Sequence, residues 1–140
     1  MTRTILDTGP LIAYLNREDR FHEWAVAQLS QLTPPLLTCE PVLAECCFLV
    51  KRSGQHPADI MTKLREGAME IALGLKAEAA AIEVLMRRYG DTPMSLADAC
   101  LVRVSELQKD SRVCTLDRHF NHYRRYGRQV IPLLAPWCRT

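Results

Sequence analysis

Short apolar runs alternate with amphipathic segments along the whole of this 140-residue chain, and this alternation restricts the fold more than any other feature. The apolar runs predict strands at residues 4–6, 36–39, 69–73, 112–116 and 129–134. Strands that are separated by helices pair in parallel through right-handed crossovers. The pattern therefore predicts an α/β fold, a three-layer α/β/α sandwich with one parallel sheet of four or five strands.

Helices are expected between these strands, because apolar residues recur there at helical spacing. The expected helices are residues 11–15, 21–32, 42–50, 57–66, 77–89 and 92–106, with a short basic helix after residue 117. Gly90 is a natural end for the fifth of them. A chain of this length suits one domain with one core, so residues 1–140 are expected to form a single domain.

The six cysteines show no C-x-x-C spacing. Four of them lie within apolar segments, where a free thiol behaves as a small apolar side chain: Cys46, Cys47, Cys100 and Cys114. We therefore expect core packing rather than zinc binding or disulfides.

No apolar run approaches the ~20 residues that a membrane-spanning helix needs. The first residues lead straight into an expected strand and show no signal-peptide pattern. The sequence thus predicts a cytoplasmic protein that does not enter the membrane.

Four acidic residues stand at unusual places. Asp7 and Asp117 directly follow expected strands, and Glu45 and Asp98 lie inside helices that are apolar on nearly all sides. Each has a simple explanation of its own. Asp7 and Asp117 would begin turns or cap helices, Glu45 would complement a helix dipole, and Ser95 with Asp98 matches a capping box. Burying a carboxylate is costly, however, and one shared site would explain all four acids together.

A shared site of four carboxylates would bind a divalent cation. In open parallel sheets, sites lie beyond the carboxyl ends of the strands. Carboxylates gathered there repel one another unless a proton or a cation enters, and a site made only of oxygen atoms favours Mg²⁺ or Mn²⁺. Thr8 and Thr115 would add hydroxyls that orient the carboxylates. Such a metal activates water and stabilises a leaving oxygen, which is the chemistry of phosphodiester hydrolysis.

The charge of the chain is unevenly distributed. No acid follows Asp117, so residues 118–140 carry a net charge of +5 and residues 1–117 a net charge of −3. The segment "DRHFNHYRRYGR" mixes aromatic residues with four candidate RNA-binding residues: Arg118, Arg124, Arg125 and Arg128. One interpretation is that the arginines bind phosphates and an aromatic ring stacks on bases. The other is a solvated basic helix whose Phe120 and one tyrosine belong to the core.

Four stretches carry a resemblance to a known family: "ILDTGPLIAYLN", "EPVLAECCFLV", "MSLADACLVRVSE" and "TLDRHF". With these in order, the chain resembles the PIN-domain (PilT N-terminal) ribonucleases, and most closely the VapC-type toxins of bacterial toxin–antitoxin pairs, from Thr4 to about Leu134. The resemblance implies a PIN-like α/β/α sandwich that cuts RNA. It also implies that the catalytic ligands of Mg²⁺ or Mn²⁺ are Asp7, Glu45, Asp98 and Asp117.

The resemblance further implies an RNA substrate, a small antitoxin protein as partner, and a homodimer, for which the apolar helices 21–32 and 58–66 offer surface. Three alternatives remain open. They are a free-standing RNA-processing PIN nuclease, a metal-dependent phosphatase or phosphoacceptor domain, and an inactive PIN-like module that only binds RNA or protein. Asp7-Thr8-Gly9 lacks the D-x-D pair that would favour a phosphatase, and the presence of all four acids disfavours an inactive module.

Overall fold

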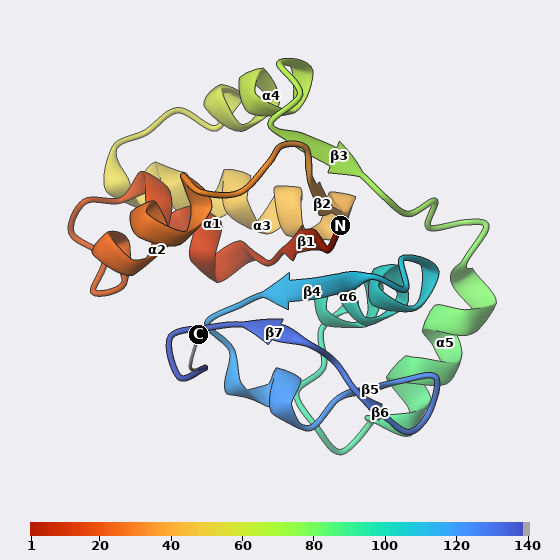
Figure 1. Ribbon diagram of the computed structural model, residues 1–140. Coiled ribbons are helices and arrows are strands. Elements are labelled where there is room, and N and C mark those ends of the chain that lie inside the picture. Colours follow the sequence, from red (N-terminus) through yellow and green to blue (C-terminus); the bar gives the residue numbers. More distant parts are fainter. Residues whose placement is uncertain (139–140) are drawn as a thin grey trace.

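Five parallel strands form the centre of the structure, a computed structural model that describes residues 1–138 (Figure 1). In chain order they are β1 (Arg3–Leu6), β2 (Leu36–Thr38), β3 (Met69–Ile71), β4 (Ser111–Cys114) and β7 (Leu133–Leu134). They lie side by side in the order β3-β2-β1-β4-β7, and every neighbouring pair is parallel. The predicted parallel sheet is confirmed.

Helices connect the strands and pack around the sheet, as a three-layer sandwich requires (Figure 1). They are α1 (Thr8–Leu15), α2 (His22–Leu29), α3 (Glu40–Val50), α4 (Ala58–Arg65), α5 (Ala79–Arg88) and α6 (Leu96–Leu107), with short 3₁₀ helices η1 (Lys51–Ser53) and η2 (Arg118–Asn121). All six helices expected between the strands are present. Within residues 1–138, none of them has the length and apolar character needed to cross a bilayer.

The strand order contains one reversal, which positions the site. The chain runs outward from β1 to β2 and β3, then returns to the other side of β1 as β4. The connections that leave the carboxyl ends of β1 and β4 therefore diverge, and this leaves a crevice where α/β proteins place their ligands. Asp7 follows β1 at this point, and its backbone N–H donates to the Cys114 carbonyl at the end of β4, at 3.0 Å.

The core lies between the sheet and the helices. Ile5, Leu37 and Val113 of the sheet are fully buried, and so is every side chain of residues 99–102 in α6. This burial explains why α6 is apolar on nearly all sides. Four cysteines are buried and Cys47 is half-buried against the same core, and all six are free thiols. The expectation of core packing is confirmed.

The C-terminal part differs from the prediction. Residues 129–134 do not form one strand: β6 (Gln129–Val130) pairs antiparallel with β5 (Arg124–Arg125), and only β7 joins the sheet. The turn of this hairpin contains Tyr126 and Gly127, which both have positive φ angles (53° and 78°), as tight hairpin turns require. The expected basic helix is therefore confined to η2.

Candidate active site

A single open pocket of about 350 Å³ contains all four acids that the sequence singled out. Its lining residues are Asp7, Thr8, Gly9, Glu45, Ser95, Asp98, Leu116 and Asp117. They come from the end of β1 and the start of α1, from α3, from the start of α6, and from the loop after β4. The pocket thus lies at the reversal of the strand order, where residues far apart in the sequence meet.

Three of the carboxylates cap the start of a helix. Asp7 accepts a hydrogen bond from the Thr8 N–H at 2.7 Å, and Asp117 accepts one from the His119 N–H at 2.9 Å. Asp98 accepts from the Ser95 N–H while the Ser95 hydroxyl accepts from the Asp98 N–H, both at 3.0 Å, which is the predicted capping box. Capping and a shared pocket are therefore not alternatives, since the same carboxylates do both.

Two threonine hydroxyls connect the acids. Thr8 Oγ1 donates to Glu45 Oε2 at 2.8 Å. Thr115 is fully buried beneath the pocket, where its Oγ1 donates to Asp7 Oδ2 at 2.7 Å and accepts from the Asp117 N–H at 3.0 Å. Both hydroxyls contact the carboxylates that they were expected to orient, and Thr115 links the acids that follow β1 and β4.

The pocket disfavours negative charge on two of its acids, Asp7 and Asp98. Burial raises the pKa of Asp7 to about 6, against the hydrogen bonds from Thr115 and Thr8, and the charges of Asp98 and Asp117 raise it further. Burial also raises the pKa of Asp98, where the charges of Asp117 and Glu45 add to the effect. Because the acids influence one another in this way, the pocket attracts positive charge, either protons or a cation.

The donor atoms fit a hard divalent cation. The polar side chains that line the pocket are carboxylates and hydroxyls, without a thiol or imidazole among them. In the described part of the chain, no three His, Cys, Asp or Glu side chains form a ready-made metal site. The carboxylates instead hydrogen bond to neighbouring N–H and O–H groups. The chemistry of the donor set therefore suits Mg²⁺ or Mn²⁺.

Tyr123 is a residue near the site that sequence reasoning did not connect with it. It is fully buried, its hydroxyl lies 3.4 Å from Asp98 Oδ2, and its ring contacts Phe120 and Tyr89 edge-on. Burial raises the pKa of Tyr123, and the nearby acid charges raise it further, so the phenol stays protonated as a donor. The sequence indicated only that Phe120 and one tyrosine belong to the core.

The structure places one of the four candidate RNA-binding arginines beside the pocket. Arg118 directly follows Asp117, is exposed, and has its guanidinium 4.6 Å from the centre of the Trp137 ring. Arg128 is exposed after the hairpin turn. Arg139, which was counted in the basic tail, lies outside the described residues.

The other two candidate arginines hydrogen bond within the fold. Arg125 Nη1 donates to the carbonyls of Ser105 and Lys109, at the C-terminal end of α6, at 3.2 and 3.1 Å. Arg124 Nη1 donates to the Asn121 carbonyl at 2.7 Å. The four arginines are thus not gathered at one place, and their RNA-binding role stays a prediction.

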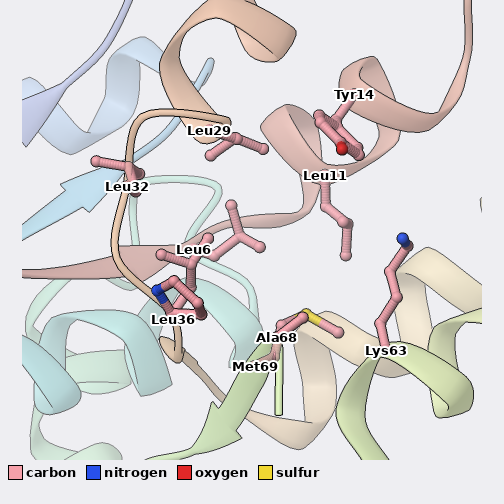
Figure 2. A pocket seen from close by; sticks show the side chains of 10 residues that line it. Leu6, Leu11, Tyr14, Leu29, Leu32, Leu36, Lys63, Ala68 and Met69 are labelled. Carbon is pink, nitrogen blue, oxygen red and sulfur yellow. The ribbon is translucent and has the colours of Figure 1, made fainter. Parts of the chain in front are cut away.

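A second cavity, of about 170 Å³, is lined mainly by apolar side chains (Figure 2). Its lining residues are Leu6, Leu11, Tyr14, Leu29, Leu32, Pro34, Leu36, Lys63, Ala68 and Met69. Lys63 is the one charged residue among them, and none is an acid. This cavity therefore offers no carboxylate for a cation, and the acidic pocket remains the candidate active site.

A family model of the PIN domain matches residues 4–126. The chain belongs to the PIN-domain family. Ribonuclease VapC26 of Mycobacterium tuberculosis is 30% identical to it over 127 residues, which cover 88% of this chain and 93% of the relative. The crystal structure of Mycobacterium tuberculosis VapC20, a sarcin-ricin loop cleaving toxin, matches with a TM-score of 0.68 at 23% identity, over 82% of this chain and 90% of that chain. These matches confirm the PIN fold and the resemblance seen in the sequence.

Proposed function

We propose that this chain is a divalent-metal-dependent endoribonuclease that hydrolyses RNA phosphodiester bonds in the cytoplasm, as the toxin of a type II toxin–antitoxin pair. The observation that carries the proposal is the single pocket that gathers Asp7, Glu45, Asp98 and Asp117 at the carboxyl ends of β1 and β4. Membership of the PIN-domain family and the similarity to a ribonuclease support it.

The four acids would hold Mg²⁺ or Mn²⁺, which supplies an activated water and stabilises the charge on the leaving oxygen. The protein's own contribution is to keep the acids in place. Thr8 holds Glu45 and Thr115 holds Asp7, while the starts of α1 and α6 place partial positive charge beside Asp7 and Asp98. These contacts limit the repulsion between the acids before a cation binds.

The partners follow from the same proposal. RNA is the substrate, and the positive charge of Arg118, Arg124, Arg125 and Arg128 attracts its phosphates. A small antitoxin protein would hold the nuclease inactive, and the active form would be a homodimer. The description of the VapC20 structure as a toxin supports the toxin role.

Cleavage of an unlabelled RNA mixture and of a small phosphate monoester, each with Mn²⁺, with Mg²⁺ and with excess chelator, tests the proposal. RNA should be cut only with metal, and the monoester should stay intact, which separates a nuclease from a phosphatase. Undiminished RNA cleavage in excess chelator would contradict the proposal that cleavage depends on a metal ion.

Substitution of each acid by its amide tests the assigned residues. Asp7→Asn, Glu45→Gln, Asp98→Asn and Asp117→Asn should each reduce cleavage strongly and non-additively, as for groups that act as one unit. Glu40→Gln is the matched control, because Glu40 is an exposed acid at the start of the same helix as Glu45 and lies outside the pocket.

A further inference from the structure

Trp137 lies against the helical turn that begins beside the acidic pocket. It follows β7, whose carboxyl end is at the same edge of the sheet as that of β4 (Figure 1). Its indole is covered by the Arg118 guanidinium at 4.6 Å, and its Nε1 donates to Asn121 Oδ1 at 3.3 Å. Two contacts therefore fix the orientation of this ring against η2, the turn that directly follows Asp117.

This indole is held differently from the aromatic side chains of the core. Trp137 is only half-buried and is not among the side chains packed against the core, whereas Phe120 and Tyr123 are fully buried within it. Trp137 also lies beyond residue 126, where the match to the family model ends. The aromatic ring that is accessible beside the pocket is thus supplied by the C-terminal segment and not by the residues that define the family.

We propose that Arg118 and Trp137 form a subsite that holds an unpaired base of the RNA next to the acidic pocket. This inference rests on the proposed nuclease function and adds to it two residues that hold a base beside the acidic pocket. The base stacks on the arginine–indole pair, and the Arg118 charge lies close to the adjoining phosphate.

The chemistry of the pair favours an unpaired base over a duplex. Every base has a flat π face that stacks on an aromatic ring or a guanidinium plane, but this face is accessible only when the base leaves its helical stack. A guanidinium over an indole is also a stable cationic surface, because the cation–π contact holds it in place without a carboxylate partner. The pair therefore combines a stacking surface with positive charge, whereas the binding of duplex RNA needs only positive charge.

Binding of a short unstructured RNA and of a duplex of equal length, measured by fluorescence anisotropy in chelator so that no RNA is cut, tests the subsite. Trp137→Leu should weaken binding of the unpaired RNA about tenfold, since one base–aromatic stack is worth roughly that much. Trp137→Phe should restore most of the loss, and duplex binding should change by less than about twofold in both variants.

Tyr126→Leu is the matched control. Tyr126 is also an exposed aromatic residue with an arginine over its ring, at 5.6 Å, but it lies in the hairpin turn and outside the pocket lining. Its replacement should leave both affinities unchanged. An unchanged affinity of Trp137→Leu for unpaired RNA, or equal losses of affinity for both RNAs, would contradict the proposed subsite. Trp137 would then only pack against η2.

A second measurement does not depend on the stability of the Trp137→Leu protein. The chain has two tryptophans, so Trp24→Phe leaves Trp137 as the sole fluorescent indole. Unpaired RNA should quench its emission and duplex RNA should not, and the absence of quenching contradicts stacking. Quenching without metal-dependent cleavage would keep the subsite and refute the nuclease, whereas cleavage without quenching would refute the subsite alone.

Discussion

Asp7 shows that burial in the pocket opposes the ionisation of a carboxylate. Burial raises its pKa to about 6, so the folded state binds a proton more tightly than the unfolded state does. The stability that this proton contributes is complete below the unfolded pKa of about 4 and is lost as the pH rises to about 6. Metal-free protein should lose on the order of 3 kcal/mol of unfolding free energy across this window.

Denaturant titrations in chelator between pH 4 and pH 7 check this prediction. Asp7→Asn cannot ionise at this position, so its stability should depend less on pH than that of the wild type, by about the amount given above. Equal pH dependence of the two proteins would show that Asp7 does not carry the effect.

We expect the Tyr123 hydroxyl to affect metal binding through Asp98. Tyr123→Phe removes the hydroxyl that lies 3.4 Å from Asp98 Oδ2, so the carboxylate loses one of the groups that fix its orientation. Since groups that support metal ligands commonly change affinity by 10- to 100-fold, Mn²⁺ binding measured by calorimetry should weaken about tenfold. Tyr89→Phe is the control, because the Tyr89 hydroxyl accepts from the Arg124 N–H and not from an acid. It should cost about 1 kcal/mol of stability and leave Mn²⁺ affinity intact.

The acids of the site, the supporting hydroxyls of Thr8 and Thr115 and the Ser95–Asp98 capping box were predictable from the sequence, but two other contacts were not. They are the contact between Tyr123 and Asp98 and the contact between Arg118 and Trp137. Each joins two segments that tertiary packing brings together, and the residue pattern of one segment does not show which other segment will lie beside it.

Asp98 and Glu45 stood out because each is a carboxylate inside an apolar helix. Asp98 is buried as this implies, but the expected burial of Glu45 was wrong, because the face of α3 that carries Glu45 is exposed.

At the scale of elements, α6 shows that one carboxylate serves two roles, and two substitutions separate them. Asp98→Asn removes the charge but keeps an oxygen that accepts from the Ser95 N–H, because Asn is also a good capping residue. The metal-free protein should keep or gain stability, and the rise in melting temperature on adding Mn²⁺ should shrink. Ser95→Ala breaks the capping box and should cost about 1 kcal/mol while the response to Mn²⁺ remains.

Thermal melts of both variants with chelator and with Mn²⁺ provide the comparison. If Asp98→Asn instead lowered the melting temperature without metal and kept the full shift with Mn²⁺, Asp98 would be a capping residue alone.

The elements themselves were largely predictable, apart from the hairpin. The helix and strand segments follow apolar periodicity, and their ends moved where a side chain caps a helix, as at Asp7 and Ser95. The β5–β6 hairpin was missed because residues 124–130 are rich in arginine and do not alternate between apolar and polar. Its turn also depends on a positive φ at Tyr126, a conformation that its residue type does not signal.

The expected self-association concerns exposed apolar side chains on α2 and α4. Met61 on α4 and Val26 on α2 are 45% and 36% exposed, on two helices that were expected to offer surface beyond the core. We predict a homodimer at micromolar concentration, with a mass in light scattering of twice 15.9 kDa. Met61→Glu should weaken it, because an unpaired charge is costly to bury at an interface.

Val84→Glu on α5 is the control for this prediction, since Val84 is 57% exposed on a helix outside the two that were expected to associate. It should leave the mass unchanged. A mass of one chain for the wild type would contradict the dimer.

The position of β1 between β2 and β4 has a consequence for synthesis of the chain. The hydrogen bond from Thr115 to Asp7 spans 108 residues, and β1 meets β4 only after most of the polypeptide exists. A growing chain that has not yet reached residue 111 carries Asp7, Glu45 and Asp98 but lacks the strand that brings Asp117 beside them. Because contacts this distant in sequence close late and slowly, a polypeptide that ends before Asp117 has no complete acidic pocket. The four acids therefore come together only after β4 and the loop that follows it have been synthesised.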